Sequence, residues 1–300
     1  YTEPGDLVLD GFAGSGMTGV AAQLCGAPDP EFKKQVEEEW KAAGEEPPKW
    51  GARRVILGDL SPAATFIAAN YNTPFDVAAF QTEAHRILAE LKTEIGWMYE
   101  TLHTDGKKKG FINYTVWSEV FSCPDCGGEV AFLQEALDPK TDRVRDHFPC
   151  PHCAVELTKD NLQRRMETMI DPATGTPWER VRFIPVLINY TVGTKKYEKM
   201  PDKQDLAVLD RIAGLTLPGS VPVNEFPIDE MYHGSRLAPK GFIRIHHLYM
   251  PRALQSLGRL WDHAGAITDP RIRLMLKFFT EQAFWTMSIL NSYRPTGFSQ

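Results

Sequence analysis

The chain has 300 residues, of which 43% are apolar and 24% charged, and its formal net charge is -6. This composition is typical of a globular protein with about two domains, and it excludes fibrous and disordered chains. Because phosphate binding relies on clustered Lys and Arg, the negative charge also argues against a surface that binds nucleic acid throughout. No apolar run approaches the roughly 18 residues of a membrane-spanning helix, so we expect a cytoplasmic protein without membrane contact.

The first 72 residues show the alternation of strand, helix, strand and helix. Apolar runs at residues 7–9 and 55–57 predict two short strands, and Ser61-Pro62 is typical of the start of a helix over 63–70. Between the strands, Met17, Val20, Ala21 and Leu24 have the spacing of a helix with one buried face. This order predicts a parallel, doubly wound sheet, and residues 27–52, rich in Pro, Glu and Lys, look like a surface insertion in it.

A glycine-rich turn, residues 10–19, lies between the first strand and the first helix. Bare backbone at the positive end of a helix dipole is suited to a ligand that lies close to the chain. A phosphate-binding P-loop is disfavoured because Met17 stands where that loop needs its lysine. Residues 14–19 also satisfy the dinucleotide pattern G-x-G-x-x-G, which by itself is weak evidence.

Two residues favour a methyl-donor site over a dinucleotide site. The first strand ends in Asp10, and Phe12 lies within the turn. S-adenosylmethionine carries a sulfonium and an ammonium group, which favour a nearby carboxylate, whereas a pyrophosphate does not. At the end of the second strand, Asp59 is placed to accept the ribose hydroxyl hydrogens, with capping of the next helix as its alternative role.

The middle of the chain changes from helical to β-type patterns. Apolar residues at helical spacing predict one long amphipathic helix over residues 77–102, followed by short β-type runs. The sequence Ile-Asn-Tyr-Thr-Val occurs at 112–116 and again at 188–192, on either side of the cysteine-bearing region. We expect these two segments to pair as the stalk of an insertion.

Four cysteines form two C-P-x-C turns, Cys123 with Cys126 and Cys150 with Cys153. Two such turns supply the four thiolates of a tetrahedral zinc ion, and a redox role would instead need one isolated pair. The 23 intervening residues exceed the common spacing, but a longer arm adds little loop-closure entropy. With four cysteines there is no open position for water, so we expect a structural zinc ribbon; His147 and His152 are substitute ligands that the site does not need.

The last hundred residues show helical stripes at 253–261 and 274–289. His246 and His247 have no partner at ligand spacing, so we assign them no role. Contact with nucleic acid would therefore have to come from local patches of basic residues, each of which could instead be an ordinary solvent-exposed surface. The candidate residues are Lys107, Lys108, Lys109, Lys195, Lys196, Lys199, Arg271, Arg273 and Lys277.

Residues 9–18 resemble motif I of bacterial DNA amino-methyltransferases, Asp-Pro-Phe-x-Gly-Ser-Gly-Thr-Thr, with Gly11 for Pro and Met17 for Thr as departures. Residues 58–64 resemble the second motif of the adenine-specific DNA methylases that contain a zinc ribbon, and the likeness is specific over 5–72 and 123–158. It implies a Rossmann-like S-adenosylmethionine-dependent methyltransferase fold, an α/β doubly wound sheet with an inserted zinc ribbon and a helical C-terminal part. Double-stranded DNA is the implied partner, and N6 of adenine, more than N4 of cytosine, the implied target. The cofactor-binding residues carried over are Asp10, Phe12, Ala13, Gly14, Ser15, Gly16, Thr18, Asp59 and Leu60.

The resemblance divides the chain into a cofactor-binding part (1–110), a ribbon insertion with its stalk (111–200) and a helical part (201–300). Such enzymes hold the target nitrogen with an Asp/Asn/Ser-Pro-Pro-aromatic tetrapeptide. The only Pro-Pro pair is Pro47-Pro48, followed by Lys49 where the aromatic belongs. We therefore expect the catalytic motif beyond Gln300, a chain cut at both ends, and no methyl transfer by these 300 residues alone. Two alternatives stay open: a zinc-ribbon module that binds nucleic acid on a non-catalytic Rossmann-like scaffold, and an NAD-type oxidoreductase.

Overall fold

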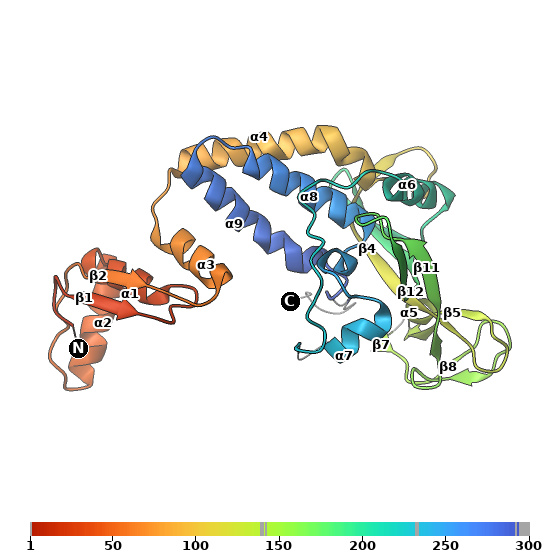
Figure 1. Cartoon of the computed structure of the whole chain (residues 1–300), viewed down its shortest axis with the longest axis horizontal. Helices are drawn as coiled ribbons and strands as arrows, with labels where there is room; N and C mark the ends of the chain where they lie inside the picture. The colour runs from red at the N-terminus through yellow and green to blue at the C-terminus, as the bar shows by residue number, and fades with distance from the viewer. Residues whose placement is uncertain (1, 139–140, 142, 232–233, 292, 294–300) are drawn as a thin grey trace. The chain divides into compact units, whose positions relative to one another are not determined.

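The computed structural model describes residues 2–138, 141, 143–231, 234–291 and 293, and the protein is mixed α/β. It divides into two compact units (Figure 1). The first comprises Tyr1–Ala84 and Ile267–Phe279, and the second comprises His85–Ala266 and Thr280–Gln300. The boundaries between the units fall within α4 (Val77–Ile95) and α9 (Pro270–Met287).

The first unit contains a two-stranded parallel sheet and the helices that follow its strands. Its further elements are β1 (Leu7–Asp10), α1 (Met17–Gly26), α2 (Pro30–Ala42), β2 (Arg54–Leu57) and α3 (Pro62–Asn72). Strands β1 and β2 pair in register, with Asp10 opposite Leu57, so the loops that follow both strands start at the same edge. Asp29 caps α2, which has no buried residue, as expected of a surface insertion.

The buried face of α1 differs from the predicted one. Gly19 and Ala22 are its buried residues, while Met17 and Leu24 are 49% and 42% exposed. The small residues let α1 approach β2 and α3 closely, because a Cβ at Gly19 would lie 2.9 Å from Leu57 Cδ1 and closer still to Asn72. Close approach through small residues, rather than an apolar stripe, therefore orients this helix.

One face of the β1–β2 sheet is bare in the structure. Leu7, Leu9 and Ile56 lie on this face and are 63%, 74% and 53% exposed, whereas Val8, Val55 and Leu57 on the other face are partly covered. Parallel strands are ordinarily covered on both faces. The doubly wound sheet expected from the sequence is therefore present only as one parallel strand pair among the described residues.

The largest sheet lies in the second unit and is a curled antiparallel sheet of six strands, ordered β10-β4-β13-β14 with β3 and β5 also on β4. Its strands are β3 (Glu100–Leu102), β4 (Lys109–Ser122), β5 (Glu129–Ala131), β10 (Gln163–Arg164), β13 (Phe183–Val192) and β14 (Lys195–Lys199). Short two-stranded pairs are formed by β6 (Leu137–Asp138) with β7 (Arg143–Val144), β8 (Phe148–Pro149) with β9 (Glu156–Leu157), and β11 (Met166–Ile170) with β12 (Pro177–Val181). The helices are η1 (Gly96–Tyr99), α5 (Phe132–Ala136), α6 (Lys203–Ala213), α7 (Gly234–Leu237), η2 (Ala238–Lys240), η3 (Ile245–Leu248) and α8 (Pro251–Gly265).

The two Ile-Asn-Tyr-Thr-Val segments pair with each other on β4 and β13, as the stalk hypothesis predicted. Ile112 lies opposite Tyr190 and Tyr114 opposite Asn189, and all three of Ile112, Ile188 and Tyr190 are buried. Beyond this stalk, the chain forms the cysteine-bearing insertion (Figure 1).

Two predicted helices are corrected by the structure. The helix expected over 77–102 ends at Ile95, because the chain turns into η1 at Gly96 and then pairs with β4 as strand β3. In α9, Leu274, Phe279 and Trp285 of the predicted apolar stripe are exposed, and Ile272 and Leu276 are buried instead. Among the described residues, no helix is long and apolar enough to cross a membrane.

Candidate cofactor and metal sites

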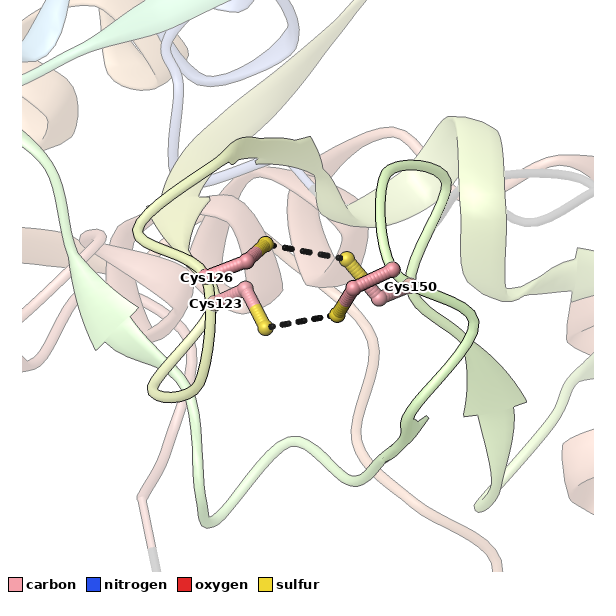
Figure 2. A group of neighbouring side chains, drawn as sticks. Cys123, Cys126 and Cys150 are labelled. Carbon is pink, nitrogen blue, oxygen red and sulfur yellow. Dashed lines mark hydrogen bonds between the residues drawn. The ribbon is translucent and has the colours of Figure 1, made fainter.

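The four predicted cysteine ligands converge at the end of the stalk. The Sγ atoms of Cys123 and Cys153 lie 3.8 Å apart, as do those of Cys126 and Cys150 (Figure 2). Four zinc–sulfur bonds of about 2.3 Å in a tetrahedron place neighbouring sulfurs about 3.8 Å apart. The four side chains are thus close enough to bind one metal ion, and their spacing fits zinc.

Each C-P-x-C turn is built from the same backbone contacts. The Gly127 N–H donates to the carbonyl of Cys123, and the Ala154 N–H donates to that of Cys150, which closes each loop around its two sulfurs. Both residues that follow the second cysteine have left-handed backbones, Gly127 with φ 69° and Ala154 with φ 60°. The two halves therefore share one geometry, although only the first has the glycine that favours it.

The ribbon has a small core that includes two of its ligands. Buried residues surround Cys123 and Cys150, namely Phe121, Val130, Ala136, Phe148, Leu157 and Leu162. Burial opposes ionisation of Cys150, but the N–H groups of Cys153 and His152 and the neighbouring thiols hold its pKa at about 6. At Cys153 the Val155 N–H favours the thiolate, but burial and the neighbouring thiols outweigh it and raise the pKa to about 12. Crowded thiols cannot all ionise without a cation, which a divalent metal supplies.

The two histidines near the ribbon have other partners. His152 Nε2 lies 2.8 Å from the carbonyl oxygen of Glu129, and His147 Nδ1 lies 3.2 Å from Glu156 Oε1. Among the described residues of the ribbon, the potential metal-binding group therefore consists of the four cysteines.

The glycine turn of the first unit brings Asp10 and Asp59 to one edge of the sheet. Asp10 accepts hydrogen bonds from Thr18 Oγ1 at 2.6 Å and from the Phe12 N–H at 3.2 Å. Asp59 accepts from the Gly14 N–H at 2.9 Å and from the Ser61 N–H at 2.9 Å. These two N–H groups, Ser61 first, lower the pKa of the Asp59 carboxyl below its ordinary value. Backbone and hydroxyl donors therefore hold both carboxylates beside the turn.

The glycines of the turn divide into two kinds. Gly16, with φ 80°, is packed: a Cβ there would lie 2.9 Å from Ala68 Cα, and its carbonyl accepts from Asn72 Nδ2. Gly11 and Gly14 have open space where a Cβ would be. Gly16 therefore holds the turn against α3, whereas Gly11 and Gly14 leave room for a ligand.

The remaining predicted cofactor residues lie at the surface of the same turn and of the loop after β2. Phe12 is 81% exposed and Leu60, directly after Asp59, is 89% exposed. The Ala13 N–H donates to the Gly58 carbonyl at 2.9 Å, which ties the two loops together, and Ser15 is exposed. Exposed apolar side chains of this size at one loop pair are suited to contact an apolar or aromatic ligand group.

Several residues of the predicted basic patches have structural partners instead. The side chain of Lys199 is only 7% exposed and contacts Asp202, Asp205 and the Leu102 carbonyl. Arg271 donates to Asn70 and to carbonyls of the segment after α3, and Arg273 donates to the Ile267 carbonyl. Lys109 is exposed but pairs with Glu100. The other exposed lysines of these patches lie beside two hairpin turns, Lys107 and Lys108 directly before β4 and Lys195 and Lys196 at the start of β14.

One group of potential ligands was missed by sequence reasoning. His246 and His247, to which the sequence assigned no role, are buried beside Asp171, and these three residues form the second potential metal-binding group of the described chain. Asp171 lies 75 residues away from His246 in the sequence, at the tip of a hairpin. No local sequence pattern connects this hairpin to the histidines. An Asp-Pro-x-x-Gly turn between two β-type runs was the available signal, and it predicts the turn but not the contact.

Comparison with known proteins yields no matching family model, no matching curated protein and no matching solved structure.

Proposed function

We propose that the first unit binds S-adenosylmethionine and that the protein acts as a DNA methyltransferase on an exocyclic base nitrogen, N6 of adenine in first place. One observation carries the proposal: Asp10 ends β1, Asp59 follows the adjacent parallel strand β2, and a glycine turn with open space lies between them. A doubly wound methyltransferase sheet, of which β1 and β2 are a part, is included in this proposal. The bare apolar face of Leu7, Leu9 and Ile56 supports it, because such a face requires a further layer.

Hydrogen-bonding capacity supports the two carboxylate roles. A carboxylate offers about four acceptor positions. Asp10 uses two of them on the protein, and Asp59 accepts from the N–H groups of Gly14 and Ser61 and, with the smallest effect, from that of Leu60. Asp59 therefore retains capacity for a ribose hydroxyl, and Asp10 retains it for the cationic methionine end. The exposed Phe12 and Leu60 supply apolar surface for the adenine ring.

The ribbon is proposed to hold one structural zinc ion on Cys123, Cys126, Cys150 and Cys153. Four thiolates fill a tetrahedral coordination shell, so zinc would provide folding free energy and no catalytic water. A small core with two ligands inside it supports this role.

Double-stranded DNA is the proposed partner, and the exposed lysines give a place to test it. Lys107 and Lys108 precede β4, and Lys195 and Lys196 follow the turn after β13. Because β4 and β13 are antiparallel, both hairpin turns lie at the same end of the sheet. Replacing all four lysines with Glu should weaken DNA binding and reduce its salt dependence, since each phosphate contact contributes to the slope.

Cofactor binding by titration calorimetry is the main test. We expect S-adenosylmethionine to bind and NAD not to bind. Asp59→Asn should weaken binding by about 2 kcal/mol, roughly thirtyfold, because the charged acceptor for the ribose is lost. Asp29→Ala is the matched control, since Asp29 also accepts two backbone N–H groups but caps α2. Equal affinity of the parent and Asp59→Asn would contradict the ribose assignment.

Turnover is expected to require a group outside the two motifs. Transfer needs the target nitrogen held in line with the sulfonium, and orientation accounts for a large part of such a barrier. The 300 residues include no Asp/Asn/Ser-Pro-Pro-aromatic tetrapeptide. With labelled S-adenosylmethionine and duplex DNA we therefore expect binding without methyl transfer above background, and robust transfer would contradict this assignment of roles. Failure of the cofactor to bind would favour the alternative, a zinc-ribbon module that binds nucleic acid on a non-catalytic scaffold.

A further inference from the structure

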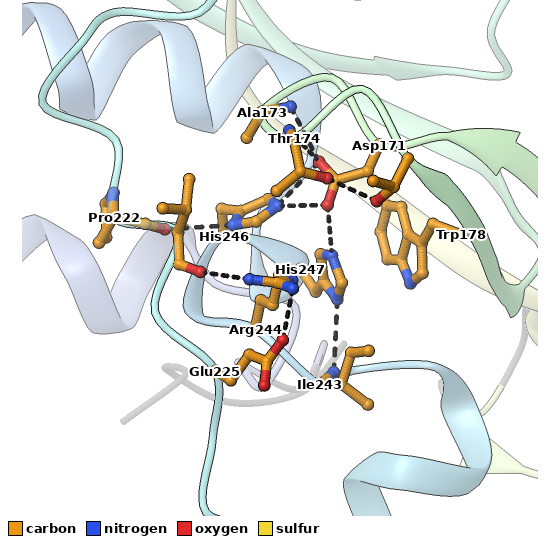
Figure 3. A network of polar contacts seen from close by, with 12 residues as sticks. Asp171, Ala173, Thr174, Trp178, Pro222, Glu225, Ile243, Arg244, His246 and His247 are labelled. Carbon is orange, nitrogen blue, oxygen red and sulfur yellow. Dashed lines mark hydrogen bonds and ion pairs between the residues drawn. The ribbon is translucent and has the colours of Figure 1, made fainter.

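Three potential ligands are buried together in the second unit, away from the four cysteines. Asp171 lies at the tip of the β11–β12 hairpin, and His246 and His247 lie on η3 (Figure 3). Their side chains are almost fully buried, with 1%, 2% and 3% of each residue exposed. One ligand atom from each lies within 4.8 Å of the others.

The backbone fixes the Asp171 carboxylate toward the two imidazoles. Asp171 Oδ1 accepts the N–H groups of Ala173 at 2.8 Å and Thr174 at 3.3 Å, and the hairpin closes through the Asp171 N–H and carbonyl. Both carboxylate oxygens lie 3.0 Å from His246 Nε2, and Oδ2 lies 3.2 Å from His247 Nε2.

The other nitrogen of His246 determines what its Nε2 can do. His246 Nδ1 lies 3.1 Å from the Pro222 carbonyl oxygen, which can only accept a hydrogen bond. Nδ1 must therefore carry a hydrogen. In a neutral imidazole, Nε2 then presents a lone pair to two carboxylate oxygens 3.0 Å away. A lone pair and a carboxylate repel each other when they are buried this close together. A proton or a metal ion between His246 Nε2 and Asp171 would remove this repulsion.

His247 contributes the third potential ligand. Its ring stacks on Trp178 at 3.8 Å between centroids, and the Ile243 N–H donates to its Nδ1 at 3.3 Å. In the neutral ring the hydrogen is then on Nε2, toward Asp171 Oδ2, so metal binding at Nε2 requires that this hydrogen be displaced. His246 already has the arrangement that metal-binding histidines ordinarily show, with its second nitrogen directed to a carbonyl.

We propose that Asp171, His246 and His247 form a second metal site, which takes a divalent first-row transition ion, zinc in first place. Two imidazoles and one carboxylate are a common ligand set for such ions, and three protein ligands leave a further position for water. Zinc bonds of about 2.0 to 2.1 Å to nitrogen and oxygen in a tetrahedron separate neighbouring ligand atoms by about 3.3 Å. Asp171 oxygens lie 3.0 and 3.2 Å from the two Nε2 atoms, slightly less than this separation.

The full chain, purified without chelator and freed of loose metal by gel filtration, is tested by metal analysis and zinc X-ray absorption. We expect two zinc ions per chain and a first shell that combines sulfur at about 2.3 Å with nitrogen or oxygen at about 2.0 to 2.1 Å. One zinc ion per chain with a sulfur-only shell would overturn the proposal and would leave a shared proton as the cation between Asp171 and His246.

Variants assign the second ion to its ligands. His246→Gln should lose one zinc and leave a sulfur-only shell, whereas Cys150→Ser with Cys153→Ser should leave one zinc bound by nitrogen and oxygen. His147→Gln, at an exposed histidine paired with Glu156, is the control and should retain two. Retention of both ions by His246→Gln would also overturn the proposal. If that variant fails to fold, the absorption spectrum of the unaltered protein still decides the question.

Discussion

The ribbon and the glycine turn organise polar groups around a candidate ligand in different ways. In the ribbon, two of the four cysteines are themselves part of the buried core. The positions of the metal ligands and the folding of the ribbon therefore depend on each other. At the glycine turn, Asp10 and Asp59 are oriented by backbone N–H groups, while neighbouring Leu9, Phe12 and Leu60 are mostly exposed. From this comparison we expect the ribbon to depend on the proposed metal and the turn to depend on close backbone packing.

Loss of the proposed ribbon metal is the largest expected effect. Structural zinc contributes on the order of 10 kcal/mol in small domains of this kind, more than so small a core can replace. Cys150→Ser should therefore abolish amide hydrogen-exchange protection in residues 121–164 and leave β1 and α1 unchanged. Zinc removal by a strong chelator should have the same effect.

Cys25→Ser is the matched control, because Cys25 lies on α1 in the first unit and outside the cysteine cluster. It should leave ribbon exchange unchanged. If the Cys150→Ser ribbon kept its protection, the ribbon would be stabilised by its apolar residues alone, and the contrast between the two regions would disappear.

The second-largest expected effect comes from a substitution at Gly16, which tests whether close packing against α3 holds the glycine turn in place. Gly16→Ala places a Cβ 2.9 Å from Ala68 Cα at a residue with φ 80°. The left-handed backbone alone costs an L-residue about 1 to 2 kcal/mol, and the close contact adds to it. We expect the first unit to lose at least this much stability in urea unfolding.

Gly11→Ala is the comparison for that measurement. Gly11 lies outside the left-handed region, and no heavy atom lies within 4 Å of the position that an added methyl group would take. Its replacement should therefore change stability by less than about 0.5 kcal/mol. Equal effects of the two substitutions would show that packing of Gly16 against α3 does not hold the turn.

The sequence predicts the parts of both regions that depend on local spacing. The C-P-x-C pairs specify four ligands because each turn fixes two sulfurs within four residues, and the structure brings all four together. The pairing of the two Ile-Asn-Tyr-Thr-Val segments could likewise be predicted, because both have high β-propensity and they lie on either side of the insertion.

Contacts between distant segments are what the sequence does not reveal. Asp171 meets His246 across 75 residues, and neither residue carries a local pattern that points to the other. The predicted stripe of α1 is wrong for a similar reason: Gly19 and Ala22 pack closely on β2 and α3, which a search for large apolar residues overlooks. The end of α4 at Ile95 depends on β3 pairing with β4, which is also a tertiary contact.

The smallest expected effect compares the two halves of the ribbon. Gly127 and Ala154 occupy equivalent left-handed positions, and Gly127 has open space around its Cβ position. Steric strain is therefore the only difference expected between glycine and alanine there. Ala154→Gly should stabilise the ribbon and Gly127→Ala should destabilise it, each by about 1 kcal/mol, because this conformation is strained for an L-residue.

Zinc competition with a coloured chelator measures both changes, since folding and metal binding are coupled in the ribbon. A change of about 1 kcal/mol corresponds to about a fivefold change in zinc affinity. Ala154→Gly should raise the affinity and Gly127→Ala should lower it. If both substitutions left the affinity unchanged, the loop conformation would not be coupled to metal binding. Opposite shifts of similar size would establish that the two turns are equivalent and that only the first has the residue best suited to its backbone.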